Sequence, residues 1–340
     1  MLRSTLFSAE TDGYSAYRIP TCICLPGGRL IVFIEGRRNS LADYGCIHIL
    51  ARISDDGGRS FGAPFLVASD RDNTVGNPCP VYDRDTGRLH LLFNGNRRDG
   101  GETLILQGKA PRSVFAVYSD DAGESWSPLR DITPQVKQAD WTWHATGPCH
   151  ALQLRSGRLI VPCNHAVLDA QKGASGPYIS GTLYSDDHGE SWHAGADVGE
   201  YTNECTLAEL PDATLYVNMR SYHGKNRRAV ARSADEGASW SAIELDEALV
   251  EPVCQGSVLS DGAALFFLNP AATERRALTL RKSCDGGRTW PCSFVLHQGP
   301  AAYSDVASLP DGSLFAVFEC GEGSPYERVD AAILAPSELA

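Results

Sequence analysis

The chain has 340 residues, of which 43% are hydrophobic, with 33 glycines and 19 prolines, a composition typical of many short strands joined by turns. Its formal net charge of −12 argues against nucleic acid or an anionic membrane surface as a partner. The same charge would repel an anionic substrate, so such a substrate would need a local cluster of arginines.

The N-terminal stretch 1–4 lacks the apolar region of a signal peptide, and no apolar run reaches the roughly 18 residues of a membrane helix. The sequence as given therefore predicts a cytoplasmic protein without a membrane span, and only a missing leader would change this to secretion. Eleven cysteines, an odd number scattered mostly through strand-like runs, are expected to be buried and reduced thiols.

Five copies of one eight-residue pattern, Ser-x-Asp-x-Gly-x-Ser/Thr-aromatic, run along the chain. They begin 65, 66, 48 and 50 residues apart, at Ser54, Ser119, Ser185, Ser233 and Ser283. The Asp carboxylate can accept backbone N–H groups across a tight turn, the glycine supplies a positive φ, and the aromatic residue anchors the turn. Repeats near 50 residues, each with several short β-rich runs, are typical of a propeller.

Six hairpin-like segments indicate the number of blades. They lie at 25–30, 85–89, 156–159, 211–215, 260–265 and 310–314, and one Ser-x-Asp pattern follows each of the first five. Between hairpin and pattern there is room for an outgoing and a return strand. We therefore predict one all-β domain over residues 1–340, a six-bladed β-propeller of four-stranded antiparallel blades that is closed by strands from both termini.

Polar residues gather at the ends of the strands opposite to the repeated turns. Each lies at the start of a first strand, at the end of a second strand or just before a third strand of its blade. In chain order they are Arg18, Arg37, Asp43, Glu204, Arg220, Arg275, Tyr303 and Glu319. The predicted topology therefore brings arginines, carboxylates and a tyrosine to one rim.

These motifs resemble the exo-α-sialidase (neuraminidase) family of six-bladed propellers, in which the repeated turn is called the Asp box or BNR repeat. The matching motifs are Tyr17-Arg18-Ile19-Pro20, the acidic loop with Asp43, Asn203-Glu204-Cys205, Asn218-Met219-Arg220-Ser221, Arg275 before the run Leu278-Thr279-Leu280, and Ala302-Tyr303-Ser304. They cover nearly the whole chain and occur in the order of the family. The resemblance implies a glycoside hydrolase.

The resemblance also implies how a sialic acid would be held. Arg18, Arg220 and Arg275 would bind its carboxylate through bidentate, charge-assisted hydrogen bonds that lysine cannot reproduce. Arg37 matches a family position that contacts the sugar, and Glu319 would hold the guanidinium of Arg18 in a supporting role. Arg276, next to Arg275, is an alternative third arginine if the loop shifts.

The implied reaction is the release of terminal α-ketosidic sialic acid from glycoconjugates with retention of configuration. Tyr303 would be the nucleophile, because a neutral phenol avoids the repulsion that a carboxylate would meet beside the substrate carboxylate. Glu204 would take the proton of Tyr303, and Asp43 would protonate the leaving oxygen and then activate water. The expected partner is thus a sialylated glycan, and we expect no cofactor and no metal.

Several alternatives stay open at this stage. The substrate could be a deaminated sialic acid or another 2-keto sugar acid, because the arginines recognise only the shared carboxylate. Asp boxes also occur in propellers that bind glycans without cleaving them. Trp141 and Trp143, in a predicted loop, could stack on a sugar, could form an acceptor platform for transfer, or could anchor the core. His150 is expected to be structural.

Overall fold

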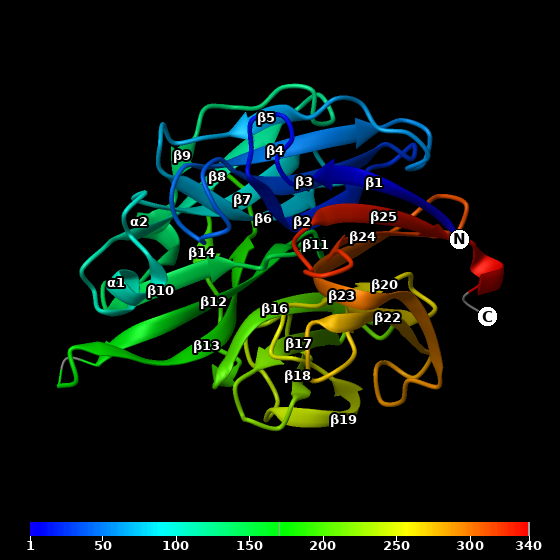
Figure 1. The fold of residues 1–340 in the computed structure, drawn as a ribbon. Helices are drawn as coiled ribbons and strands as arrows, with labels where there is room; N and C mark the ends of the chain where they lie inside the picture. The colour runs from blue at the N-terminus through cyan, green and yellow to red at the C-terminus, as the bar shows by residue number, and fades with distance from the viewer. Residues whose placement is uncertain (170, 339–340) are drawn as a thin grey trace.

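The computed structural model describes residues 1–169 and 171–338, and the chain there is built almost entirely of short strands (Figure 1). The strands follow one another in six groups, which we call units 1 to 6. The strands within a unit pair antiparallel, and except in unit 3 each pairs with the next strand of its unit, as expected for strands joined by tight hairpins. The predicted all-β class is confirmed. The four sheets that contain these units are open, and the six-bladed ring stays a prediction.

Units 1 to 3 lie within residues 16–200. Unit 1 consists of β2 (Ala16–Cys24), β3 (Leu30–Arg37), β4 (Ile47–Ser54) and β5 (Phe65–Ala68). Unit 2 consists of β6 (Thr74–Tyr82), β7 (Leu89–Asn96), β8 (Arg112–Ser119) and β9 (Arg130–Asp131), with the short helices α1 (Glu102–Leu106) and α2 (Thr133–Val136). Unit 3 consists of β10 (Trp141–Thr146), β11 (Leu152–Gln153), β12 (Leu159–Asp169), β13 (Ala174–Ser185), β14 (His193–Ala194) and β15 (Gly199–Glu200).

Units 4 to 6 complete the described chain. Unit 4 consists of β16 (Thr202–Glu209), β17 (Leu215–Ser221), β18 (Arg227–Ser233) and β19 (Glu244–Val250). Unit 5 consists of β20 (Ser257–Ser260), β21 (Leu265–Pro270), β22 (Arg276–Ser283) and the first half of β23 (Cys292–Ser308). Unit 6 consists of the second half of β23, β24 (Leu314–Cys320), β25 (Arg328–Leu334) and the N-terminal β1 (Leu2–Ser8), and the turn η1 (Pro336–Glu338) follows. The two chain ends therefore meet in one sheet, as expected.

Buried hydrophobic clusters fill the interfaces between neighbouring units. Five clusters join unit 1 to 2, 2 to 3, 3 to 4, 4 to 5 and 5 to 6. A sixth cluster joins unit 6 back to unit 1, where Phe315 and Val317 of β24 pack with Leu30 and Val32 of β3. Each unit thus has a packed neighbour on both sides, which is why the strands read as nearly continuous apolar runs.

The five Asp boxes form the turns that the sequence predicts. In the third box, the Asp187 carboxylate accepts bonds from the Ser191 N–H at 2.8 Å and from the Ser185 and Ser191 hydroxyls, and the Gly189 N–H donates to Ser185 Oγ at 2.8 Å. The other boxes repeat these contacts. The aromatic residue of each box packs into the interface with the preceding unit, as Trp192 does against His90 of unit 2.

Two structural features favour glycine at position 189. Its φ is +81°, and a Cβ atom would lie 2.3 Å from His90 Cε1. We expect Gly189→Ala to lower the free energy of unfolding by about 2–4 kcal/mol, from backbone strain and overpacking together. Gly262→Ala is the matched control, because its φ is +84° but no atom lies within 4 Å of the added Cβ. Urea unfolding should show a clearly smaller loss for Gly262→Ala, and equal losses would contradict the packing argument.

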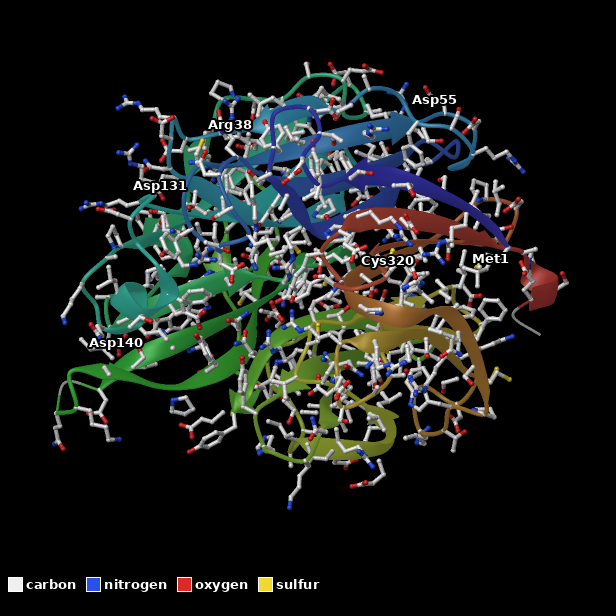
Figure 2. The ribbon with its side chains drawn as sticks, viewed as in Figure 1. Met1, Arg38, Asp55, Asp131, Asp140 and Cys320 are labelled. Atoms are coloured by element: carbon white, nitrogen blue, oxygen red, sulfur yellow. The ribbon has the colours of Figure 1, made fainter. Side chains whose placement is uncertain are left out.

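The eleven cysteines are all free thiols. Seven are buried and two are half-buried, but Cys284 and Cys292 are exposed, so the expectation of burial is wrong for these two. Figure 2 shows Cys320 among the packed strands and charged residues such as Asp55 and Asp131 at the periphery. Among the described residues, no helix has both the length and the hydropathy of a membrane-crossing segment.

Candidate active site

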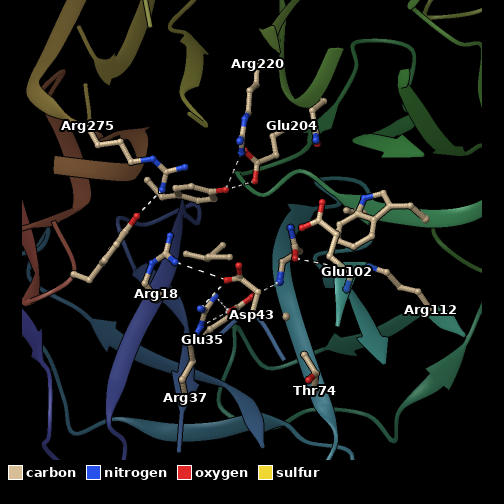
Figure 3. A pocket seen from close by; sticks show the side chains of 18 of the residues that line it. Arg18, Glu35, Arg37, Asp43, Thr74, Glu102, Arg112, Glu204, Arg220 and Arg275 are labelled. Carbon is tan, nitrogen blue, oxygen red and sulfur yellow. Dashed lines mark hydrogen bonds and ion pairs between the residues drawn. The ribbon is translucent and has the colours of Figure 1, made fainter. Parts of the chain in front are cut away.

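A pocket of about 240 Å³ lies where the ends of strands and loops from all six units meet (Figure 3). Seven of the eight predicted residues line it: Arg18, Arg37, Asp43, Glu204, Arg220, Arg275 and Tyr303. The eighth, Glu319, is fully buried and does not line the pocket, but its carboxylate accepts a hydrogen bond from Arg18. The structure therefore brings the predicted residues together, and their catalytic roles stay predictions.

The first strands of five units carry a register shift near their beginning, and the site is built on four of these irregularities. The shifts lie between Arg18 and Thr21 in β2, Gly76 and Cys79 in β6, Thr202 and Cys205 in β16, and Ala301 and Ser304 in β23. A β-bulge bends its strand and redirects a side chain. Four bulges at equivalent positions thus turn side chains such as Glu204 and Tyr303 into one pocket.

Tyr303 lies at the centre of this group. Its hydroxyl hydrogen-bonds to Glu204 Oε1 and lies 3.4 Å from Arg220 Nη1, which also donates to Glu204 Oε2 at 2.9 Å. The Tyr303 backbone N–H donates to Glu319 Oε2 at 3.1 Å. The sequence suggested that Tyr303 begins a strand. The structure instead places it within the continuous strand β23. The first part of this strand pairs with β22 and the last part with β24, and Tyr303 lies at the register shift between Ala301 and Ser304.

The protonation of Tyr303 follows from its surroundings. Burial, and next the Glu204 carboxylate, raise the pKa of Tyr303 well above its ordinary value of 10, and the Arg220 and Arg275 guanidiniums only partly oppose this. The phenol is therefore protonated at neutral pH and donates its proton toward Glu204. Glu204 is placed to accept that proton during a reaction.

Three guanidinium groups surround the phenol. Arg18 Nε donates to Glu319 Oε1 at 2.8 Å, and Arg275 Nη1 donates to the hydroxyl of Tyr326 at 2.7 Å. The guanidinium carbons of Arg18 and Arg275 lie 5.2 and 5.6 Å from the centre of the Tyr303 ring. Within the described chain, the buried Nε of Arg220 has no hydrogen-bond partner. The cluster is thus suited to bind an anion.

The structure also separates the two neighbouring arginines of unit 5. Arg275 lines the pocket, whereas Arg276 begins β22 and is exposed. Successive residues of an extended chain point to opposite sides, so only one of the two can face the pocket. Arg275 is therefore the third arginine of the cluster.

Asp43 lies at the edge of the pocket, in the loop between β3 and β4, with 73% of its side chain exposed. Its Oδ1 lies 2.7 Å from Arg37 Nη1 and 3.8 Å from Arg18 Nη1. Desolvation alone would raise the pKa of Asp43, but the charges of Arg37 and Arg18 outweigh it and hold that pKa below its ordinary 3.8. Asp43 is thus ionised in the free protein.

Comparison with known proteins shows the family of the chain. Residues 28–316 match the family described as BNR repeat-like domain. The chain is 30% identical over 400 residues to Sialidase-3 of Mus musculus, a match that covers 99% of this chain and 95% of that protein. The chain belongs to the sialidase family. It is therefore a glycoside hydrolase.

Two further relatives belong to the same family. A sialidase of Micromonospora viridifaciens is 31% identical over 349 residues, which are 95% of this chain but only 53% of that protein. The solved structure of the Hadza microbial sialidase Hz136 is 28% identical, with a TM-score of 0.89 over 98% of this chain and 68% of that chain. The match thus extends over nearly all of the present chain.

Several pocket residues of this sialidase escaped the sequence analysis. They are Glu35, Asn77, Glu102, Arg112, Tyr222 and Tyr326. Tyr326 could have been found, because it follows Glu319 in the loop between β24 and β25, at the strand end where the other residues were sought. Arg112 begins β8, the third strand of unit 2, and satisfies the same positional rule. Glu102 had no such signal, because it lies on a helix inserted between two strands.

The two tryptophans of unit 3 have different surroundings. They lie on strand β10, so the expectation of a loop is wrong. Trp141 is buried and stacks on His165 with ring centres 3.6 Å apart, whereas Trp143 lines the pocket and donates Nε1 to Asn164 Oδ1 at 2.9 Å. His150 bonds to buried Asp305 through Nδ1 at 2.8 Å, in agreement with a structural role.

One group of described residues has ligand types and spacing that suit a cation: Asp83, Asp85 and His188, at the Asp-box end. The Asp83 carboxylate already accepts hydrogen bonds from Gln153 Nε2 at 2.8 Å, Thr86 Oγ1 at 2.7 Å and His188 Nδ1 at 2.9 Å. Since these bonds satisfy the buried carboxylate without an ion, we interpret the group as a structural network.

Tyr326 should position the arginines of this sialidase. Its ring centre lies 4.2 Å from the Arg18 guanidinium carbon, and its hydroxyl holds Arg275. A hydrogen bond to a charged group contributes about 1.5–3 kcal/mol, so we expect Tyr326→Phe to lower kcat/KM about 10- to 100-fold. Because the arginines would bind ground state and transition state alike, the change should appear mainly in KM.

The control for Tyr326→Phe is Tyr201→Phe, which removes an exposed phenol and should leave kinetics unchanged. Initial rates on a fluorogenic sialoside give both constants, and thermal unfolding reports whether the fold is retained. A loss confined to kcat would contradict the positioning role.

Proposed function

We propose that this protein is a retaining exo-sialidase that hydrolyses terminal α-ketosidic sialic acid through a covalent tyrosyl intermediate. The observation that carries the proposal is the hydrogen bond between Tyr303 and Glu204 in a pocket where Arg18, Arg220 and Arg275 converge. A phenol with its own base beside a cluster of three cations suits attack on a carbon that bears a carboxylate.

We propose further that the six units form a closed six-bladed propeller. The hydrophobic cluster between units 6 and 1 supports this, as does the pairing of β1 with β25. Closure explains how Arg18, near the start of the chain, reaches Glu319 and Tyr303 near its end. A closed ring also protects the edges of the inner strands.

The carboxylate of the substrate would bind between the three arginines. Glu319 and Glu204 neutralise Arg18 and Arg220 only in part, and among the described residues Arg275 has no carboxylate within 4.0 Å. A bound carboxylate would supply the missing negative charge and accept the unused guanidinium donors. This would place the adjacent anomeric carbon over the Tyr303 hydroxyl.

In the first step, the Tyr303 oxygen forms a bond to the anomeric carbon while Glu204 takes the phenolic proton. The bond between that carbon and the leaving oxygen breaks, and Asp43, protonated in the complex, gives its proton to that oxygen. In the second step water attacks the same carbon, Asp43 takes a proton from the water, and the departing phenolate recovers its proton from Glu204. Two inversions give net retention.

The test is hydrolysis of an α-sialoside followed in real time by proton NMR. We expect the α-anomer of free sialic acid to appear first and to mutarotate later. A 3-fluoro sialosyl fluoride should label Tyr303, as peptide mass spectrometry would show. First appearance of the β-anomer would refute the mechanism, and tight binding of sialosides without any hydrolysis would indicate a glycan-binding propeller.

A further inference from the structure

Arg112 is a fifth arginine of the pocket, besides Arg37, and lies on the wall across from the three that surround Tyr303 (Figure 3). It is 6% exposed. None of the described carboxylates lies within 4.0 Å of its guanidinium, in contrast to Arg18, Arg37 and Arg220. A buried cation without an ion pair is costly and calls for another explanation.

Three neutral oxygen atoms accept hydrogen bonds from the Arg112 guanidinium. Its Nε donates to the His144 carbonyl at 2.7 Å, Nη1 to Asn96 Oδ1 at 2.8 Å and Nη2 to Asn77 Oδ1 at 3.2 Å. The guanidinium carbon lies 4.1 Å from the centre of the Trp143 ring. A guanidinium has five N–H donors, so three bonds leave two donors for the pocket.

The electrostatics of this wall leave Arg112 as a cation without a direct carboxylate partner. Desolvation lowers the pKa of Arg112 to about 10, although Glu35 and Glu102 oppose the shift, so the group is still a cation at neutral pH. Glu35 does not compensate it directly, because its carboxylate bonds to Arg37 at 2.7 Å and to the Asn77 N–H at 2.8 Å. The positive charge of Arg112 therefore remains available to a ligand.

The surroundings of Arg112 are polar and fixed. Glu102 lies near Arg112 in Figure 3, and Thr74, Asn77 and Ala145 line the same pocket. Asn77 has a φ of +58°, and its carbonyl accepts the Thr146 hydroxyl at 2.7 Å. A Cβ at Gly76 would lie 2.2 Å from Glu35 Oε1, so this segment packs closely against the Glu35 carboxylate.

The chemistry of the sugar indicates which substituent of the substrate should lie against the wall that contains Arg112. In a six-membered 2-keto sugar acid, C5 lies across the ring from the anomeric C2. If the carboxylate on C2 binds the three arginines, the C5 substituent points toward the opposite wall. A hydroxyl at C5 can accept from a guanidinium and donate to a neighbouring amide or carboxylate oxygen. An N-acetyl group also offers a carbonyl acceptor, but its methyl needs extra space and would desolvate the polar groups around the buried cation.

We propose that Arg112 selects for a hydroxyl group at C5, so that the enzyme cleaves deaminated sialosides in preference to N-acetylated ones. The inference rests on the proposed function, because it needs the sugar to be bound through its carboxylate. Arg112 is the specificity-determining residue, and Trp143, Asn96 and Asn77 position it.

The test compares the 4-methylumbelliferyl α-glycosides of the deaminated acid and of the N-acetylated acid. We expect wild-type kcat/KM to be at least tenfold higher for the deaminated glycoside. Arg112→Ala should lower this ratio tenfold or more, since it removes the cation and opens space. Arg276→Ala, an exposed arginine outside the pocket, should leave the ratio unchanged.

The outcomes separate this inference from the proposed function. If wild type cleaves both glycosides but prefers the N-acetylated one, only the selectivity is overturned. If neither is cleaved, the proposed function fails as well. Should Arg112→Ala unfold, calorimetric binding of the two 2,3-unsaturated acids to wild type decides, because tighter binding of the N-acetylated acid would overturn the proposal.

Discussion

Replacing Tyr303 by phenylalanine should lower kcat on an aryl sialoside by at least about 10³-fold, the order of loss seen when an enzyme loses its nucleophile. The substitution removes one oxygen atom and leaves the ring between Arg18 and Arg275 in place. Binding of a 2,3-unsaturated sialic acid, measured by calorimetry, should therefore change far less than kcat. This contrast would assign the loss to chemistry rather than to the arginines.

Tyr222→Phe is the matched control for Tyr303→Phe. Tyr222 also lines the pocket, and its hydroxyl accepts only a long hydrogen bond of 3.4 Å from Asn203 Nδ2. We expect nearly wild-type rates and no change in the melting temperature. Wild-type activity of Tyr303→Phe would refute the covalent mechanism, and equal losses in both variants would point to general damage to the pocket.

Asp43→Asn should produce an effect that depends on the leaving group. Asparagine cannot transfer a proton, so kcat/KM on sialyllactose should fall by about 10²–10⁴-fold, the usual contribution of general acid catalysis. On a 4-nitrophenyl sialoside the leaving group needs no proton, and the first step should be little affected. The second step still lacks its base, so 4-nitrophenol should appear in a burst equal to the enzyme concentration.

The control for Asp43→Asn is Asp99→Asn, which alters an exposed carboxylate paired with Arg97 at 2.7 Å outside the pocket. It should leave both substrates unaffected. Equal losses of Asp43→Asn on the natural and the activated substrate, without a burst, would contradict an acid and base role for Asp43.

The charges around Asp43 also predict a pH effect. In the free protein, Arg37 and Arg18 hold its pKa below 3.8, so the protonated form needed for the first step becomes scarce as pH rises. A substrate carboxylate on Arg18 would weaken one of these two influences and raise the pKa of Asp43 in the complex. The basic limb of kcat should therefore lie at higher pH than that of kcat/KM. Coincident limbs would contradict this coupling.

Local turn chemistry is what the sequence determined most firmly. Each Asp box is closed by contacts within eight residues, such as those of Asp187 with Ser185 and Ser191, so five copies predicted five turns and the strands that lead into them. Strand order then followed from short connections, and it indicated the end of the sheets at which Arg18, Glu204 and Tyr303 would meet. The turns and the strand order could be predicted because they depend on spacing along the chain and not on contacts between residues far apart in the sequence.

Only the tertiary structure decided which side chains complete the pocket. The strand bulges that turn Glu204 and Tyr303 inward, the choice of Arg275 over Arg276, and the different surroundings of Trp141 and Trp143 all arise from packing between units. The residue type alone does not distinguish Arg112 from an arginine on the surface. Its proposed role in specificity follows from its burial beside Trp143 without an ion pair. Such surroundings are built from residues of several units, so no single stretch of sequence contains them.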